Sequence, residues 1–540
     1  MQTCRTIEIL DTTLRDGAQG QGISFSLQDK LAILRTLDEL GVAWIEAGNP
    51  GSNPKDMEFF RLAKDIRLEQ SKLCAFGSTR KKNVTPSNDE NVLRLLDSET
   101  GCVVIVGKSW DLHVREVLRA EPAENLAMIG DTIAFFKEKG RLVFFDAEHF
   151  FDGWLSDPDY SLSTLEAARN AGADRIVLCD TNGGAFPDIV FEAVMAALLL
   201  CHGVDSDKPF LGIHAHNDID LAIANTLSAI DAGCLHAQGT LAGFGERCGN
   251  TCLASLIPSL EIKLGYKCLP DGRLEKITSL TRKAAEIANI SLNSNIPYVG
   301  SHAFSHKGGM HSDGMLKSRN SFEHVDPVLV GNDRHFLISE VGGKSAVAEK
   351  ARRIDPSINK DHPVAAALAE KLKSLEAEGW AFEGADASFE LLVRRELGRS
   401  SSLFSIEAYR VVSEHPAGET VACSHAWVKV LVDGSHEIAA AEGDGPVHAM
   451  DSALRRALRF FFPELEQVRL IDYKVRVIDG NAATAAKVRV LITSTDGIQT
   501  WTTAGVSGDI LDASRAALTD SIEYKLITDN ERRAVGAKNK

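Results

Sequence analysis

Short apolar runs alternate with amphipathic helical patterns over the first 250 residues of the chain. Each run is rich in β-branched or aromatic residues and ends in polar residues and glycine, which is typical of a buried parallel strand. Eight such runs begin at Ile7, Val42, Leu73, Cys102, Arg141, Arg175, Phe210 and Leu235. Eight strand and helix units in about 250 residues match a TIM barrel in number and size. We therefore predict an α/β fold with a catalytic TIM (β/α)8 barrel over residues 1–265.

An open doubly wound sheet is the alternative for alternating strands and helices. That fold usually has fewer strands and often a glycine-rich turn after the first, whereas the first turn here reads TTLRDGAQG. Polar residues also gather after nearly every strand, where barrel active sites are built. Between the strands, helices such as the one from Leu27 to Leu40 are expected to begin after Ser26 and to end at Gly41.

The second half of the chain has a different pattern. Residues 266–400 are mostly helical and irregular and indicate helical linker subdomains. Residues 401–530 contain a duplicated unit, in which alternating strands are followed by a glycine turn and a helix. AWVKVLVDG precedes the helix HAMDSALRRALRFF in the first copy, and KVRVLITSTDG precedes DILDASRAALTDSIEYKL in the second. We predict an α+β regulatory domain of two βββα repeats, and a flexible tail over residues 531–540.

Composition excludes several classes of protein. Hydrophobic residues make up 44% and charged residues 25%, which is ordinary for a globular protein. A net charge of −16 disfavours nucleic acid as a partner. The longest apolar stretch is too short to span a bilayer, so no membrane segment is expected. The N-terminus lacks the pattern of a secretory signal and the ten cysteines are scattered, which favours the cytoplasm.

Candidate metal ligands fall on the predicted strands one, seven and eight. His214 and His216 alternate along strand seven, so both can face the barrel mouth. Asp16 in LRDG and Asn250 in GERCGN would add a carboxylate and an amide oxygen. This set suits Mn²⁺, Zn²⁺, Fe²⁺ or Mg²⁺. A His-x-His pair alone is more typical of hydrogen-bonded histidines, but its combination with Asp16 predicts a divalent metal site.

Three other polar residues lie at the predicted barrel rim. Arg15 directly precedes Asp16 and should face the other way unless the strand has already turned. It could form a salt bridge that seals the barrel, or stabilise an oxyanion beside the metal. Glu148 ends strand five and Thr181 ends strand six. Such residues are often helix caps or solvated side chains, but their place at the rim makes them candidates for catalysis.

Seven strings carry a family resemblance. In chain order they are DTTLRDGAQG, GSNPKD, FDAEHFFDG, DTNGG, HAHND, FGERCGN and AFSHKGGMHSDG. Together they resemble the isopropylmalate synthase and homocitrate synthase group of metal-dependent barrel acyltransferases, and most closely the citramalate synthases of that group. The terminal repeat resembles the allosteric effector domain of the same group, so the resemblance covers nearly the whole chain.

The resemblance implies a Claisen-type condensation of acetyl-CoA with pyruvate, which gives citramalate on a route to isoleucine. A divalent metal on Asp16, His214 and His216 would chelate the keto acid, with Asn250 as a ligand or a close neighbour. The implied cofactor is a divalent metal ion, Mn²⁺, Mg²⁺ or Zn²⁺, and the implied co-substrate is acetyl-CoA.

The resemblance also implies roles for the other candidates. Arg15 would stabilise the developing alkoxide, Thr181 and Asp313 would bind substrate, and Glu148 with His311 would remove the methyl proton of acetyl-CoA. In similar enzymes the segment around His311 reaches the neighbouring subunit's active site, so a homodimer is implied. Phe322 departs from the tyrosine that similar enzymes often carry, and any role of that hydroxyl is in doubt.

Alternatives to a feedback-regulated citramalate synthase stay open at this point. A 2-isopropylmalate synthase differs only in the size of its acceptor pocket, which one or two side chains decide. An acyl-CoA lyase or aldolase would use the same metal barrel, but the effector-like repeat, expected to bind an amino acid such as isoleucine, argues against it. A noncatalytic amino-acid sensor is disfavoured because Arg15, Asp16, His214 and His216 are intact.

Overall fold

The computed structural model describes residues 5–538, except 201–209, 307–310, 312–313, 316, 319–320, 337–342, 353, 360, 383, 400–402, 415–422 and 479–485. The chain divides into two compact units, Met1–Phe304 with His324–Arg334, and Ser305–Glu323 with His335–Lys540. Each unit is described by itself.

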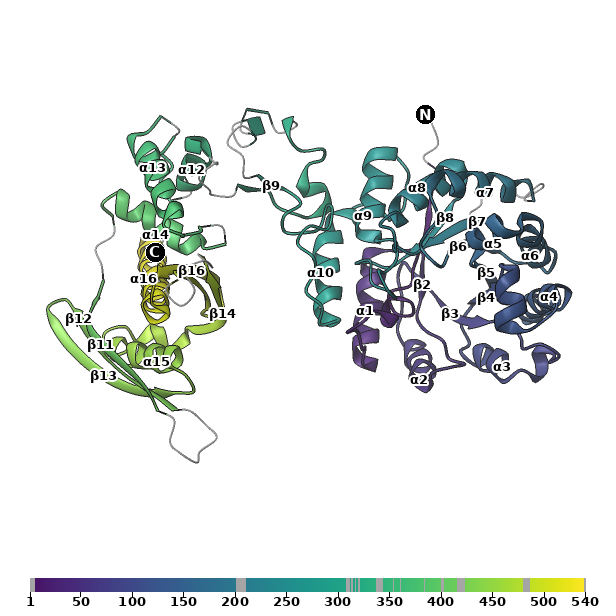
Figure 1. Cartoon of the computed structure of the whole chain (residues 1–540), viewed down its shortest axis with the longest axis horizontal. Helices are drawn as coiled ribbons and strands as arrows, with labels where there is room; N and C mark the ends of the chain where they lie inside the picture. The colour runs from purple at the N-terminus through teal and green to yellow at the C-terminus, as the bar shows by residue number, and fades with distance from the viewer. Residues whose placement is uncertain are drawn as a thin grey trace. The chain divides into compact units, whose positions relative to one another are not determined.

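A closed parallel barrel of eight strands in sequential order forms the first unit and confirms the predicted fold (Figure 1). Its strands are β1 (Glu8–Asp11), β2 (Trp44–Glu46), β3 (Lys72–Ser78), β4 (Cys102–Lys108), β5 (Leu142–Glu148), β6 (Arg175–Asp180), β7 (Leu211–Ala215) and β8 (His236–Gly239). Helices surround them: α1 (Leu27–Leu40), α2 (Pro54–Ala63), α3 (Glu90–Asp97), α4 (Pro122–Glu138), α5 (Phe150–Ser156), α6 (Pro158–Asn170), α7 (Pro187–Leu199) and α8 (Ala222–Ala232).

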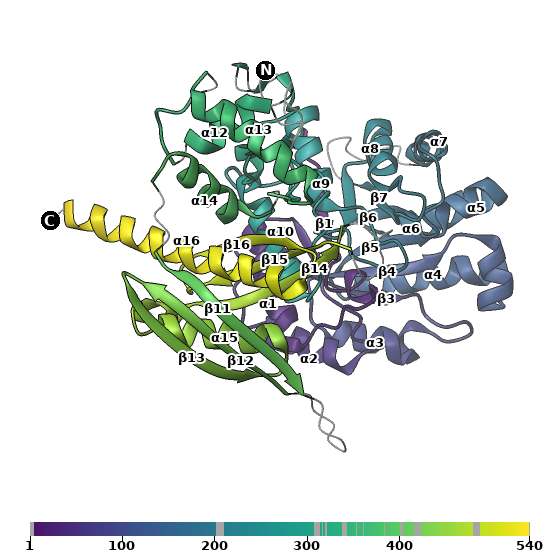
Figure 2. The same ribbon diagram turned by 60° about the vertical axis from the view of Figure 1, so that its left-hand side comes forward.

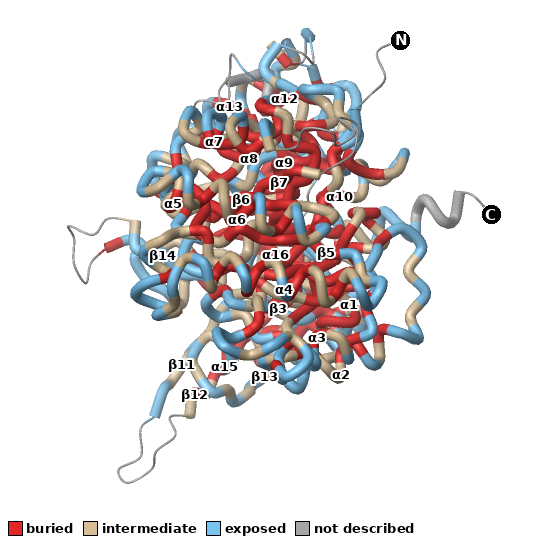
Figure 3. Tube along the Cα trace, turned by 90° about the vertical axis from the view of Figure 1, so that its right-hand side faces the viewer, coloured by how far each residue is buried: buried red, intermediate tan, exposed pale blue. Residues whose placement is uncertain are grey.

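Most residues of the barrel strands are buried (Figure 3), and they divide between two apolar clusters. Residues such as Ile45 and Phe145 belong to the large core between strands and helices. Their neighbours Trp44 and Phe144 belong to a separate cluster inside the barrel, where the two rings meet edge to face at 5.0 Å. Successive side chains of a strand point to opposite faces, so every second residue of each strand faces the barrel interior.

Helix α1 shows how local sequence sets the element ends. The Ser26 hydroxyl accepts from the Asp29 amide while the Asp29 carboxylate accepts from the Ser26 amide, so a capping box begins the helix. Gly41 ends it in the left-handed conformation with φ of 89°, which favours glycine. Both predicted ends of this helix are confirmed.

The barrel unit extends beyond the predicted boundary at residue 265. Helix α10 (Ile277–Ile287) packs against α1, and the Thr278 hydroxyl donates to the carbonyl of Val330. Residues up to Phe304, together with 324–334, therefore belong with the barrel and not with the linker. The sequence missed this because the helical pattern of α10 does not say which surface the helix covers.

The second unit begins with a short parallel pair, β9 (Ser305–His306) and β10 (His335–Phe336). Helices α12 (Gly343–Arg352), α13 (Pro363–Ala377) and α14 (Asp386–Glu396) follow and share an apolar cluster that includes Val347, Leu368 and Phe389. The helical character predicted for this segment is confirmed.

Two βββα repeats form the rest of the second unit, as predicted (Figure 2). The first has strands β11 (Ser405–Glu414), β12 (Cys423–Val432) and β13 (Ser435–Gly443) with helix α15 (Pro446–Leu458). The second has β14 (Arg469–Val477), β15 (Val488–Thr495) and β16 (Thr500–Ser507) with helix α16 (Ile510–Lys538). The sheets are antiparallel, and one apolar core includes residues of both repeats.

Two predicted boundaries of the terminal domain need correction. Residues 531–540 were expected to form a flexible tail, but α16 continues through them to Lys538, and Glu531 pairs with Arg394 of α14 at 2.5 Å. Ser388 of α14 donates to Asp520 of α16, so the helix before residue 400 packs with the repeats. Among the described helices, none combines the length and apolar character needed to cross a membrane.

Candidate metal centre and active site

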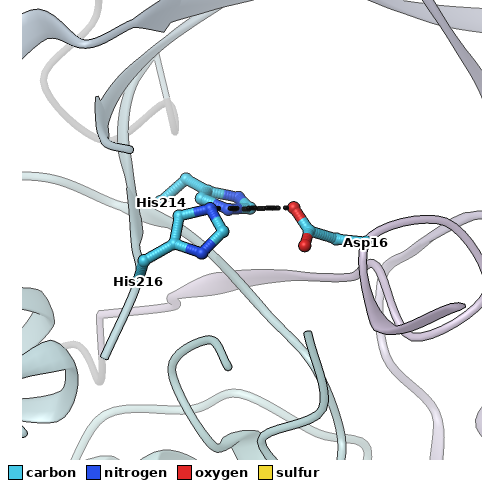
Figure 4. A group of neighbouring side chains, drawn as sticks. All are labelled: Asp16, His214 and His216. Carbon is cyan, nitrogen blue, oxygen red and sulfur yellow. Dashed lines mark ion pairs between the residues drawn. The ribbon is translucent and has the colours of Figure 1, made fainter. Parts of the chain in front are cut away.

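Asp16, His214 and His216 converge inside the barrel mouth (Figure 4). The Asp16 carboxylate lies 3.5 Å from Nε2 of His214 and 3.9 Å from Nε2 of His216. All three side chains are buried, and one ligand atom from each lies within 4.8 Å of the others. One carboxylate and two imidazoles on one face of a small space form a donor set for a divalent cation.

A turn after β1 brings both Arg15 and Asp16 to this face. Strand β1 ends at Asp11, and residues 13–16 form a turn in which the Arg15 amide donates to the carbonyl of Thr12. Arg15 Nη1 therefore reaches the Asp16 carboxylate at 2.9 Å, and its Nε reaches Glu46 at 2.5 Å. The exception stated for a strand that has already turned therefore applies, and strand alternation does not turn Arg15 away from Asp16.

A chain of buried hydrogen bonds fixes the orientation of His214. Its Nδ1 lies 2.9 Å from Oε1 of Gln238, which can only accept, so Nδ1 carries the proton. The amide of Gln238 in turn donates to Asp146 at 3.1 Å. With Nδ1 held by Gln238, Nε2 is the ring nitrogen that faces Asp16 and the site. Such a partner for the second ring nitrogen is typical of histidines that bind metals.

Asn250 meets the site from a loop and not from strand eight. Its amide donates to the Asp16 carboxylate at 3.0 Å, and residue 250 pairs with His216 in an isolated bridge. The side-chain oxygen of Asn250 is buried with no hydrogen-bond partner in the described structure. The nitrogen of this amide, and not the oxygen, contacts Asp16, and a divalent cation is a group that a buried, unpaired amide oxygen can bind.

The electrostatics of the site also fit a cation. Burial alone would raise the pKa of Asp16, but the charge of Arg15 and the two histidines hold it well below its usual range. Burial and the nearby Glu46 carboxylate raise the pKa of Asp146. Burial, with the charge of His214, lowers the pKa of His216 to about 4, which leaves the neutral imidazole that metals require.

Asp16, His214 and His216, the candidate metal ligands, line a cavity of about 850 Å³. Arg15, Glu148 and Thr181 all line it, so the structure brings these predicted residues together. Glu148 forms an ion pair with Lys108 of the neighbouring strand. The Thr181 hydroxyl accepts from the backbone amide of His149 at 2.9 Å, so its own proton is available to an acceptor in the cavity.

The remaining candidates lie in the second unit. His311 is exposed, and its ring stacks on Phe322 with centroids 4.4 Å apart. Phe322 therefore packs on the proposed base where similar enzymes often have a tyrosine. Asp313 lies outside the described residues.

Relatives with a known name match almost the whole chain. The (R)-citramalate synthase of Aquifex aeolicus is 46% identical over 525 residues, 97% of this chain and 98% of that protein. The (R)-citramalate synthase of Geobacter sulfurreducens matches to the same extent, with 46% identity over 97% and 98%. The chain belongs to the citramalate synthase family.

The domain families agree with this membership. Residues 6–283 match the HMGL-like family, residues 298–379 the homocitrate synthase post-HMGL domain-like family, and residues 383–526 the LeuA allosteric (dimerisation) domain. The match to the LeuA allosteric domain begins before α14, which agrees with the packing of this helix against α16. A probable 2-isopropylmalate synthase of Methanopyrus kandleri is 29% identical, over 96% of this chain and 97% of that protein. The chain is therefore less similar to that protein than to the two citramalate synthases, which are 46% identical.

Sequence reasoning missed three buried polar residues of the site. Glu46, Asp146 and Gln238 each interrupt an apolar strand run at the parity that faces the barrel interior. The strand register places Gln238 of β8 directly beside His214 of β7. A polar side chain inside an apolar strand was the available signal.

Proposed function

We propose that the protein condenses acetyl-CoA with pyruvate to give (R)-citramalate and CoA. The observation that carries this proposal is 46% identity to (R)-citramalate synthases over nearly the full length of both chains. The cavity supports it, because the candidate metal ligands, an arginine, a carboxylate and a hydroxyl all line it.

Asp16, His214 and His216, with the Asn250 oxygen, would hold the divalent ion. When bound, the ion supplies Lewis acidity toward the oxygens of a 2-oxo acid. Thr181 orients the acceptor by donating its free hydroxyl proton to the carboxylate. Arg15 is fixed by Glu46 and Asp16, and its guanidinium stabilises the negative charge that develops on the keto oxygen.

The carbon–carbon bond forms after proton removal from the acetyl methyl group. We assign this to Glu148, held at the cavity wall by Lys108, with His311 as the second member of the pair. The methyl carbon then attacks the keto carbon of pyruvate, and the keto oxygen takes up a proton. Water hydrolyses the thioester, which releases the CoA thiol and makes the reaction irreversible.

We further propose that the protein works as a homodimer in which the segment around His311 completes the partner's site. The match of residues 383–526 to an allosteric domain supports an amino-acid effector, for which isoleucine is our choice as the end product of the route. Most of the described cysteines are buried, which is consistent with the cytoplasm.

The test is release of CoA thiol from acetyl-CoA with Mn²⁺ present, with pyruvate and 2-oxoisovalerate compared at equal concentrations. We expect release that depends on pyruvate. Preference for 2-oxoisovalerate would indicate isopropylmalate synthesis, and release with neither acid would favour the lyase or sensor alternatives. Adding isoleucine or leucine to the same assay tests the effector, and only isoleucine is expected to inhibit.

A further inference from the structure

Three lysines line the wall of the active-site cavity above β2 and β3. Lys55 lies in the first turn of α2, and Lys81 and Lys82 follow β3. All three line the same cavity as Asp16 and His214. We call these three side chains the lysine rim.

The lysine rim differs from the other cations of the cavity because none of its three ammonium groups forms an ion pair in the part of the chain that the structure describes; the Asp29 carboxylate interacts with the charge of Lys55 only from a greater distance. Lys55 donates to the carbonyl of Phe25 at 2.7 Å, and Lys82 to that of Arg119 at 2.9 Å. The other cationic side chains of the cavity are ion-paired, namely Arg15 with Asp16 and Glu46, Lys30 with Asp56, Arg80 with Glu124 and Asp131, and Lys108 with Glu148.

Three lysines without an ion-pair partner among the described residues stand out on a chain with a net charge of −16. Charges of one sign that line a cavity raise the local concentration of a ligand of the opposite sign. A 2-oxo acid carries one carboxylate, which Thr181 and a metal ion held by Asp16, His214 and His216 would already bind. The lysine rim is therefore in excess of what the acceptor needs, and points to a second ligand with several negative charges.

The same cavity has a substantial apolar lining. Ile23, Phe25, Leu118 and Met128 contribute to it, and Val117 lines it although its side chain is 58% exposed. Covering an exposed valine side chain with a ligand removes apolar surface from water, which favours binding. The lining thus suits a long ligand with an uncharged arm and an anionic end.

We propose that the lysine rim binds the phosphates of the acetyl-CoA nucleotide. The pantetheine arm then lies along the apolar lining, and the acetyl thioester reaches Glu148 and Arg15. Ammonium groups bind phosphate as compact point charges, which requires no carboxylate partner. This inference rests on the proposed function and adds the place of the co-substrate.

The experiment compares two acetyl donors on the full-length enzyme at saturating pyruvate. Acetyl-CoA carries the phosphates, whereas the acetyl thioester of N-acetylcysteamine carries the same reacting group without them. For K81E/K82E and for K55E we expect kcat/KM with acetyl-CoA to fall about tenfold or more, because each change replaces an attraction by a repulsion. With the short thioester, kcat/KM should stay within about twofold of wild type.

K283E is the matched control, since Lys283 is exposed on α10 and does not line the cavity. It should leave both donors unaffected. The KM of wild type for acetyl-CoA should also rise with ionic strength more than the KM for the short thioester. Equal losses for both donors, or no loss in K81E/K82E, would overturn the proposal.

Failure of the proposed function gives a different result. In that case wild type releases no CoA thiol with any 2-oxo acid. Calorimetric titration with CoA alone then tests the lysine rim by itself. Weaker CoA binding by K81E/K82E than by wild type and K283E supports the rim, and equal binding refutes it.

Discussion

Gln238 is the residue whose replacement tests the metal centre most directly. Gln238→Leu removes the acceptor of the His214 Nδ1 proton, at 2.9 Å, and the donor to Asp146, at 3.1 Å. The volume changes little, so the effect is on hydrogen bonds and not on packing. Without the acceptor, the His214 proton can move to Nε2, which faces Asp16 at 3.5 Å. That proton must leave before a metal binds.

The expected magnitude follows from the two orphaned groups. Each buried polar group left without a partner costs about 1 to 3 kcal/mol. About 1.4 kcal/mol is a factor of ten in a dissociation constant, so the Kd for Mn²⁺ should rise about 10- to 100-fold, as is usual when such a partner is lost. Calorimetric titration of the metal-free protein with Mn²⁺ measures this without any dependence on turnover.

Asn332→Leu is the matched control. It also removes a buried amide of the barrel unit, one that donates to the carbonyls of Tyr298 and Gly300 at 2.8 and 3.0 Å. It should destabilise the fold by a similar amount and leave Mn²⁺ binding unchanged. If Gln238→Leu is folded but binds Mn²⁺ within about twofold of wild type, the assignment of Gln238 as a positioning residue for His214 is wrong.

Three other predictions concern catalysis, the metal loop and the terminal domain. Glu148→Gln should lower kcat about 10²- to 10⁴-fold while the Kd for Mn²⁺ stays at the wild-type value; an unchanged kcat would remove Glu148 as the base. Gly245→Ala should weaken Mn²⁺ binding about tenfold, because residue 245 has a φ of 156° and an added Cβ would lie 2.1 Å from the amide nitrogen of Asn250. The control is Gly101→Ala, whose added Cβ meets nothing within 4 Å. Equal Mn²⁺ binding by the two variants would contradict this prediction. Lys525→Met should destabilise the terminal domain at neutral pH. Burial would raise the pKa of Asp496, but its bond to Lys525 lowers it to about 2, so the stabilisation is present above the unfolded pKa of about 4 and is lost between about pH 4 and 2. Hydrogen exchange of the terminal helix across this range should show the difference from wild type shrinking as pH falls, and a constant difference would refute the pairing.

Much of the fold follows from local pattern alone. All eight barrel strands and both βββα repeats were predictable, because strand alternation, β-branched runs and glycine turns act over a few residues. Two members of the candidate metal site were predictable for the same reason, since His214 and His216 share a strand face. The seven motif strings supplied the family, because they place specific residues at fixed strand ends.

The partners of the buried polar groups were decided only by the tertiary structure, because they depend on contacts between distant segments. The hydrogen bond between Gln238 and Asp146 joins positions 92 residues apart, and that between Asn250 and Asp16 joins positions 234 apart. No local pattern specifies such partners, because they arise only when the barrel closes, which turns β5 and β8 toward the same interior and brings β8 beside β1. The same holds for α10 and α14, whose amphipathic patterns predict a buried face but not the surface that buries it. Sequence thus determined the elements and their inward faces, and closure of the barrel decided which polar groups meet there.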